Sequence, residues 1–110
     1  MTSAAPLQIT PAELSHRLRR DKDLQVLDVR EKWEAAICAL PGSRNIPLSE
    51  VPARVGEIDG NRPLVVYCHH GGRSLRAVQW LREHGFERTT NLTGGIHQWS
   101  LQIDPSVPTY

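Results

Sequence analysis

Short apolar segments alternate with helix-like segments along this chain, and this alternation constrains the fold more than any other feature. The clearest apolar segment is Pro63-Leu64-Val65-Val66-Tyr67, which has the length and residue types of a buried strand. Weaker signals of the same kind predict extended segments at 7–9, 24–29, 43–47 and 89–92. Parallel strands need a crossover between them, usually a helix. We therefore predict an α/β fold whose parallel sheet is covered by helices on both faces.

Capping residues mark where the intervening helices begin and end. The stretch Thr10-Pro11-Ala12-Glu13 has the pattern of a capping box with proline at the first helical position, and it predicts a helix that ends near Arg20. Ser49 and Ser74 are suitable N-caps for later helices, and Gly85 is a suitable stop. The remaining helices are predicted at about 31–37, 49–58, 74–84 and 96–101.

Length and charge narrow the class of protein. The 110 residues are enough for one compact core, so we predict a single domain, 1–110, with its core at about 7–103 and an irregular tail at 104–110. The 13 Lys and Arg residues nearly balance the 12 Asp and Glu residues, which leaves a formal net charge of +1. This balance predicts neither a nucleic-acid partner nor a membrane partner.

The compartment is inferred from features that the chain lacks. No segment approaches the roughly 18 apolar residues of a membrane-spanning helix. The N-terminal MTSAAP does not have the charged-then-apolar order of a secretion signal, so a cytoplasmic location is expected. In that compartment the two cysteines are predicted to be reduced thiols.

The segment CHHGGRS, residues 68 to 74, follows the best strand and precedes the best helix. In α/β folds, ligands bind beyond the carboxyl ends of the strands, where such loops lead into helix N-termini. Gly71 and Gly72 allow the loop to curl with positive φ and to turn its N–H groups inward. Arg73 adds a cation, and the helix adds the positive end of its dipole. These features favour a reactive thiolate at Cys68.

The residues of this segment also occur in other kinds of site. Cys68 could be a packed core residue. A metal site is not expected, because Cys68, His69 and His70 are consecutive and no second ligand pair stands at zinc spacing. A nucleotide phosphate loop is excluded, because a lysine is required where Arg73 stands. His69 and His70 fit loop walls better than obligatory acid–base groups, and Ser74 fits an N-cap whose hydroxyl could face the sulfur.

Four segments together resemble the rhodanese-like domain family. CHHGGRS resembles its active-site loop, and Asp28-Val29-Arg30-Glu31 resembles its DVRE signature. Residues 40–47, LPGSRNIP, resemble its HIPGAxNIP segment, and residues 92–99 resemble its LxGGxxxW ending. The resemblance covers roughly residues 7 to 108 and implies a rhodanese-like fold with a central five-stranded parallel sheet.

The resemblance also implies an activity, that of a sulfurtransferase of the thiosulfate type. Cys68 would be the nucleophile that carries a persulfide, residues 69–73 (His69, His70, Gly71, Gly72 and Arg73) would form the cradle, and Ser74 would close it onto the helix. The loop from Cys68 to Arg73 has six residues, which resembles sulfur-transferring members. The related dual-specificity phosphatases and arsenate reductases have one residue more. These enzymes, and a non-catalytic regulatory module, are the alternative functions.

The residues around the loop and the partners of the protein are indicated by weaker sequence patterns. Asp28 and Arg30 are expected near the loop, with Asp28 orienting the backbone rather than touching substrate. Trp33 is expected either at the pocket mouth or in the core, and Cys38 is expected to be a packed thiol rather than a second sulfur relay. The implied partners are a small sulfur-containing anion such as thiosulfate and a sulfur-donor or sulfur-carrier protein, because the tail resembles modules appended to carrier-activating enzymes. No feature calls for a metal or an organic cofactor.

Overall fold

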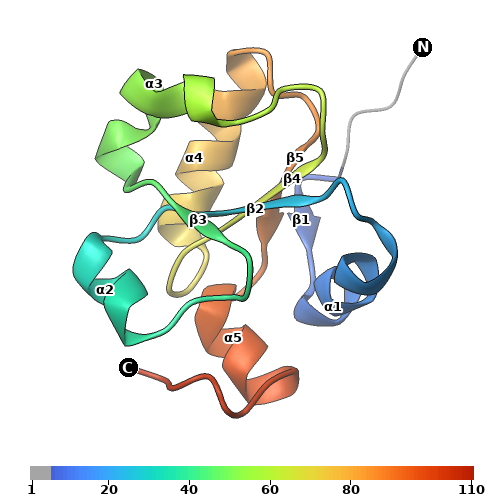
Figure 1. Ribbon diagram of the computed structural model, residues 1–110, viewed down its shortest axis with the longest axis vertical. Coiled ribbons are helices and arrows are strands. Elements are labelled where there is room, and N and C mark those ends of the chain that lie inside the picture. Colours follow the sequence, from blue (N-terminus) through green and yellow to red (C-terminus); the bar gives the residue numbers. More distant parts are fainter. Residues whose placement is uncertain (1–5) are drawn as a thin grey trace.

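A computed structural model describes residues 6–110, so residues 1–5 of the predicted domain lie outside the described range. Five strands form one sheet in the order β1-β5-β4-β2-β3, and every neighbouring pair is parallel (Figure 1). The strands are β1 Gln8–Ile9, β2 Gln25–Asp28, β3 Arg44–Asn45, β4 Leu64–Tyr67 and β5 Thr89–Leu92. The predicted five-stranded parallel sheet is therefore confirmed.

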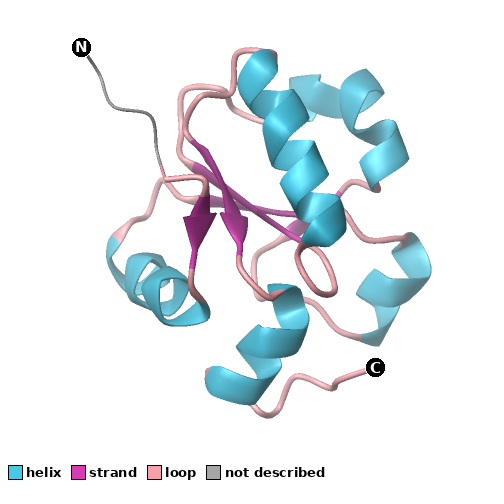
Figure 2. Cartoon of the chain, turned by 180° about the vertical axis from the view of Figure 1, so that it is seen from behind, coloured by secondary structure: helices cyan, strands magenta, loops and turns pink. Residues whose placement is uncertain are grey.

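Helices cover both faces of this sheet, as Figures 1 and 2 show from opposite sides. On one face α3 and α4 pack against alternate strand residues such as Leu27 and Val66. On the other face α1 and α5 pack against the strand residues in between, such as Val26 and Val65. Successive strand residues point to opposite faces, so strands buried on both sides are continuously apolar. The helices are α1 Pro11–Arg20, α2 Lys32–Ile37, α3 Val51–Arg54, α4 Gly72–Glu83 and α5 Gly95–Gln102.

The first helix begins where its capping residues predict. The Thr10 hydroxyl accepts a hydrogen bond from the Glu13 N–H at 3.1 Å, and the Glu13 carboxylate accepts one from the Thr10 N–H at 2.9 Å. Both halves of the capping box are thus formed, and they satisfy two N–H groups that have no partner within the helix.

Two predicted helix boundaries are wrong. The helix expected from Ser49 to about Ile58 is a 3₁₀ turn, then the single turn α3, then a second 3₁₀ turn, and Ser49 makes no cap bond. Pro52 has no N–H to donate and Gly56 has a low helix propensity, so a continuous helix is not supported there. The fourth helix begins at Gly72 with Gly71 as its N-cap, so Ser74 lies inside the first turn.

The carboxyl ends of the three central strands meet at one edge of the sheet. Asp28 at the end of β2 pairs in register with Tyr67 at the end of β4. Cys68 therefore leaves the sheet beside the segment that carries Arg30. The irregular tail at 104–110 follows α5 and returns to this edge beside α2 (Figure 1).

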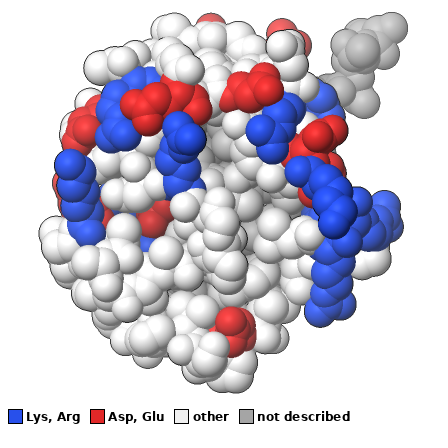
Figure 3. Space-filling model, in the orientation of Figure 1, with Lys and Arg blue, Asp and Glu red and all other residues white. Residues whose placement is uncertain are grey.

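Charged side chains of both signs are interspersed on the face seen in Figure 3. This mixture agrees with the small net charge of the chain. Among residues 6–110, none of the helices is both long and apolar enough to cross a membrane.

Candidate active site

The sulfur of Cys68 lies inside the loop of residues 68–74, which we call the active-site loop. Cys68 is 1% exposed, and its Sγ accepts hydrogen bonds from the Gly71 N–H at 3.1 Å and the Ser74 N–H at 3.3 Å. Ser74 lies in the first turn of α4, where N–H groups have no partner within the helix. Backbone donors from the loop and from the helix N-terminus therefore converge on one sulfur atom, which is the arrangement that stabilises negative charge there.

Only one of the two loop glycines has a left-handed backbone. Gly71 has a φ of 108°, whereas Gly72 has no positive φ. The positive φ expected at both glycines therefore occurs only at Gly71. A Cβ on Gly71 would also lie 3.3 Å from the Gly94 nitrogen. A Cβ on Gly72 would meet nothing within 4 Å. Gly71 is the residue that lets the chain turn back over the sulfur.

The hydroxyl of Ser74 faces the sulfur at 3.3 Å, but it also has a shorter hydrogen bond to the side-chain oxygen of Asn91. A hydroxyl has only one hydrogen to donate. Because the Asn91 oxygen is the nearer acceptor, the Ser74 hydroxyl donates its hydrogen to Asn91. The backbone N–H groups are therefore the donors that remain to the Cys68 sulfur. Asn91 is buried at the end of β5, and its amide donates to the Gly71 carbonyl at 3.2 Å. It ties the loop to the sheet.

The N-terminus of α5 braces the other side of the loop. The Ile96 N–H donates to the Cys68 carbonyl at 2.9 Å, and the His97 N–H donates to the His69 carbonyl at 3.1 Å. Gly95 makes this approach possible, because a Cβ there would lie 2.5 Å from both of those carbonyl oxygens. These contacts hold the backbone of Cys68 and His69 in place.

Arg73 does not point its guanidinium fork at the sulfur. Its two terminal nitrogens donate to the Glu34 carboxylate of α2 at 2.6 and 2.8 Å. Glu34 is 3% exposed, and the hydrogen bonds from Arg73 are the main reason that its pKa falls to about 2 despite its burial. The same pairing raises the pKa of Arg73. The predicted loop cation is therefore balanced by a carboxylate from a different element.

A tyrosine from the tail completes this ion pair. The Tyr110 hydroxyl donates to Glu34 at 2.8 Å and accepts from Arg30 at 3.0 Å. Burial raises the pKa of Tyr110 to about 12, with Glu34 acting in the same direction. The tail is irregular, as predicted, but its last side chain is part of the site.

Asp28 and Arg30 form a buried pair beneath the loop. Arg30 is 0% exposed, and its Nε and Nη2 atoms donate to the Asp28 carboxylate at 2.9 and 2.7 Å. Asp28 also accepts from the Arg30 backbone N–H at 3.0 Å, which is the orienting role expected for it. Burial acts to lower the pKa of Arg30, but its hydrogen bonds to Asp28 and Tyr110 outweigh this and raise it.

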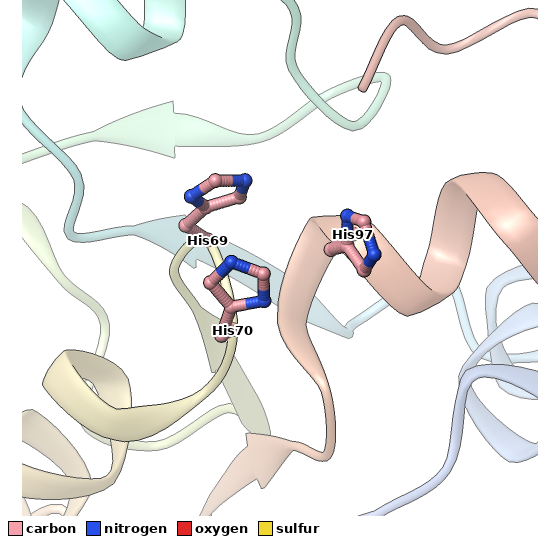
Figure 4. A group of neighbouring side chains, drawn as sticks. All are labelled: His69, His70 and His97. Carbon is pink, nitrogen blue, oxygen red and sulfur yellow. The ribbon is translucent and has the colours of Figure 1, made fainter. Parts of the chain in front are cut away.

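Three histidines gather beside the loop (Figure 4). His69 and His70 come from the loop and His97 comes from α5. The His69 ring stacks on Tyr110 with centroids 3.9 Å apart and lies 4.0 Å from the His70 ring on its other side. Burial, followed by the neighbouring charge of His70, lowers the pKa of His69. The expectation that His69 and His70 line the loop wall agrees with these positions.

Trp33 and Cys38 lie at the margin of the site. Trp33 is 64% exposed and meets Tyr110 edge to face, so it is not a core residue. Cys38 is half-buried against the Pro108 carbonyl, 3.3 Å away, and both cysteines are free thiols. A cavity of about 530 Å³ adjoins Arg73 on the α3 and α4 side, but Cys68 does not line it.

Sequence reasoning missed four residues of this site, namely Glu34, Asn91, His97 and Tyr110. Each comes from a different element, and none stands in a recognisable pattern with the loop. The one available signal was the pair Gly94-Gly95, which the sequence placed within the LxGGxxxW segment. A glycine pair before a helix also indicates a close backbone approach.

Comparison with known proteins agrees with this geometry. Residues 10–102 match the sequence model of the rhodanese-like domain. The chain is 36% identical over 100 residues to a sulfurtransferase of Allochromatium vinosum, which covers 91% of this chain and 94% of that protein.

Two plant relatives are much longer proteins. The chain is 39% identical over 92 residues to the rhodanese-like/PpiC domain-containing protein 12 of Arabidopsis thaliana, with 80% of this chain covered. It is 32% identical over 130 residues to the adenylyltransferase and sulfurtransferase MOCS3 of the same plant, with 97% of this chain covered. The chain spans 31% and 28% of the lengths of these two relatives.

Solved structures share the fold over most of their length. A rhodanese-related protein of Thermoplasma volcanium superposes with a TM-score of 0.83 at 30% identity, over 96% of this chain and all of that one. The human single-domain sulfurtransferase TSTD1 superposes with a TM-score of 0.78 at 26% identity, over 89% of this chain and 98% of that one. The family match over residues 10–102, in a chain with this fold, shows that it belongs to the rhodanese-like domain family.

Proposed function

We propose that this protein is a sulfurtransferase that carries a sulfane sulfur as a persulfide on Cys68. The observation that carries the proposal is the convergence of the Gly71 and Ser74 N–H groups on the Cys68 sulfur. A thiolate held in this way is a nucleophile, and the same donors suit the terminal sulfur of a persulfide anion.

In the first half-reaction the Cys68 thiolate attacks the outer sulfur of thiosulfate. A bond forms between the two sulfur atoms, and the sulfur–sulfur bond of thiosulfate breaks. Sulfite leaves with the bonding electron pair, and Cys68 keeps the transferred sulfur as a persulfide. No external oxidant or reductant is needed, because the oxidation of the cysteine sulfur is balanced within thiosulfate.

In the second half-reaction a thiophilic acceptor attacks the outer sulfur of the persulfide. Cyanide would leave as thiocyanate and a thiolate would leave as a persulfide, and in both cases the Cys68 thiolate is restored. The loop backbone is braced by Asn91 and by the N-terminus of α5, so its donors stay in place through both steps. Preorganised donors of this kind need no rearrangement as charge moves.

Two observations favour sulfur over phosphate as the transferred group. The loop from Cys68 to Arg73 has six residues, one fewer than the related phosphatases and arsenate reductases have. In addition, the Arg73 fork is already occupied by the Glu34 carboxylate, so it is not free to hold two oxygens of a phosphoryl group.

A sulfur-donor or sulfur-carrier protein is included in this proposal as a partner. The match to the adenylyltransferase and sulfurtransferase MOCS3 extends over 97% of this chain, and the match to the putative sulfur carrier protein YrkF of Bacillus subtilis extends over 84% of it. The second of these matches supports a sulfur-carrier partner. Thiosulfate as the donor and a cytoplasmic location are parts of the same proposal. Fractionation of cells that express the chain tests the location.

Measurement of the intact mass after incubation with thiosulfate tests the proposal directly. We expect wild-type protein to gain one sulfur atom and to lose it again on addition of cyanide, with thiocyanate formed in equal amount. Cys68→Ser should gain nothing. Cys38→Ser is the matched control, because Cys38 lies outside the loop, and it should behave as the wild type does.

Two other outcomes of this experiment would each identify one of the alternative functions. Turnover of an aryl phosphate without a sulfur adduct would identify a phosphatase. The absence of both an adduct and turnover, from a correctly folded protein, would identify a non-catalytic regulatory module.

A further inference from the structure

The three histidines beside the active-site loop bring ring nitrogens close together. His69, His70 and His97 each offer one nitrogen, and these three atoms all lie within 4.8 Å of one another. Figure 4 shows the rings grouped between the active-site loop and the start of α5. The start of α5 brings His97 close to the loop histidines, because the His97 N–H donates a hydrogen bond to the His69 carbonyl.

Two of these histidines have a ring nitrogen without a partner. The Nε2 atom of His69 and the Nδ1 atom of His97 are buried, and within residues 6–110 neither has a hydrogen-bond partner. A buried polar atom without a partner destabilises the fold. A ligand that bonds to these nitrogens would remove that destabilisation.

We propose that His69, His70 and His97 together bind a divalent transition-metal ion of the class that prefers imidazole, with Zn²⁺ as the representative. Three histidines are a complete protein ligand set for a tetrahedral ion that keeps one position open. The set contains no carboxylate, and this distinguishes it from sites for Mg²⁺ or Ca²⁺, which prefer oxygen ligands.

Binding requires a small contraction of the cluster. With Zn–N bonds of about 2.1 Å, ligand nitrogens in a tetrahedral site stand about 3.4 Å apart. His70 is exposed, so its ring can turn toward the other two without displacing core residues. The His69 ring packs against both the Tyr110 ring and the His70 ring, so its position is already restricted.

This site is not visible in the sequence, which predicted no metal ligand set. His69 and His70 are adjacent and cannot by themselves surround an ion, and His97 lies on a different helix. The ion would bind to residues that follow Cys68 directly, so it would also hold the active-site loop in its observed conformation.

Metal titration of a cysteine-free variant tests the site. The protein carries Cys38→Ser and Cys68→Ser, so that thiolates cannot bind the ion, and any affinity tag is removed. We expect one Zn²⁺ per chain by calorimetry, and visible absorption from a nitrogen-ligated tetrahedral site on titration with Co²⁺. His97→Ala and His70→Ala, each made in that variant, should weaken binding at least about tenfold. His97→Gln gives a second variant at that position should the alanine fail to fold.

His84→Ala is the matched control, because His84 stacks on Trp80 away from the cluster, and it should bind Zn²⁺ as the parent variant does. Equal Zn²⁺ binding by the parent variant and His97→Ala would overturn the proposal. So would binding that is lost when the cysteines are replaced. Because the measurement is made without Cys68, its outcome is independent of whether Cys68 forms a persulfide.

Discussion

Cys68 is a buried thiol whose sulfur accepts hydrogen bonds from two backbone N–H groups. The cation of the loop, Arg73, is paired with Glu34. Individual residues therefore act here by fixing the backbone or by balancing charge. Two predictions follow from these roles.

Replacement of Gly95 should disturb the active-site loop, whereas replacement of Gly72 should not. A Cβ on Gly95 would lie 2.5 Å from the Cys68 and His69 carbonyl oxygens, at a φ of 63°. We expect Gly95→Ala to lower the free energy of unfolding by at least about 2 kcal/mol. Gly72→Ala, which meets open space, should remain within about 1 kcal/mol of the wild type. Urea denaturation of the two variants decides this, and equal stabilities would contradict it.

The ion pair between Glu34 and Arg73 should make stability depend on pH in the acid range. The pKa of Glu34 is about 2 in the folded protein, below the value of about 4.3 in an unfolded chain. The unfolded state therefore binds more protons between these values. The stabilisation is complete above about pH 4.3 and is lost as the pH falls toward 2.

We expect Glu34→Gln to be less stable than the wild type by about 1–2 kcal/mol at neutral pH, with the difference shrinking toward pH 2. The full pKa shift would imply more, but the Arg73 side chain is 37% exposed and solvent weakens the pair. Chemical denaturation at several pH values measures this. Glu57→Gln is the control, since its pair with Arg54 is open to solvent, and its stability should change little. A pH-independent difference for Glu34→Gln would count against the assigned pKa.

At the scale of elements, the start of each helix decides what it contributes. Helix α1 begins with a side-chain cap and serves stability, because Thr10 and Glu13 satisfy its first N–H groups. Helix α4 begins at Gly72, and its N-cap Gly71 provides no side-chain cap. The Ser74 N–H in its first turn faces the sulfur of Cys68 instead. Helix α5 uses its first N–H groups to hold the active-site loop.

Replacement of two of the predicted N-caps, Thr10 and Ser49, should therefore have unequal effects. Thr10→Ala should lower the free energy of unfolding by about 1 kcal/mol, the usual value for an N-cap. Ser49→Ala should cost less than about 0.5 kcal/mol, because Ser49 is exposed and makes no cap bond. Thermal and urea denaturation monitored by circular dichroism compares them. A larger loss for Ser49→Ala would be inconsistent with the turn observed at residues 48–50.

On the scale of the whole molecule, the site is assembled from both ends of the sequence. Asn91 of β5 bonds to Gln8 of β1 and to the active-site loop, and Tyr110 of the tail bonds to Glu34 of α2. The network that supports Cys68 therefore forms only when the sheet and the tail are both in place.

Replacement of Tyr110 should show how much of the site depends on the tail. Tyr110→Phe removes the hydroxyl that joins Arg30 to Glu34, and we expect a loss of about 1–2 kcal/mol in the free energy of unfolding. Tyr110→Ala also removes the ring that stacks on His69, so its loss should be larger. Denaturation of both variants, alongside sulfur transfer from thiosulfate, measures the effect. Wild-type stability in Tyr110→Ala would show that the tail is not needed.

Much of the fold and part of the candidate site could be predicted, because they depend on local sequence patterns. Apolar runs, glycines and the Thr10 capping box act over a few residues, so the strands, the first helix and the position of Cys68 were evident. The helix predicted at 49–58 was wrong because Pro52 and Gly56, which lie within that segment, do not support a continuous helix. The His69, His70 and His97 cluster could not be predicted, because it depends on where α5 docks.

Local patterns in the sequence were enough to predict the α/β class, the parallel sheet and the loop that presents Cys68 at the carboxyl edge. These features follow from residue periodicity and backbone preferences, which are short-range. The pairing of Arg73 with Glu34, the bridge that Tyr110 makes from Glu34 to Arg30, and the place of His97 beside the loop histidines arise only in the folded chain. Those are contacts between residues far apart in the chain, and no spacing in the sequence encodes the docking that brings them together.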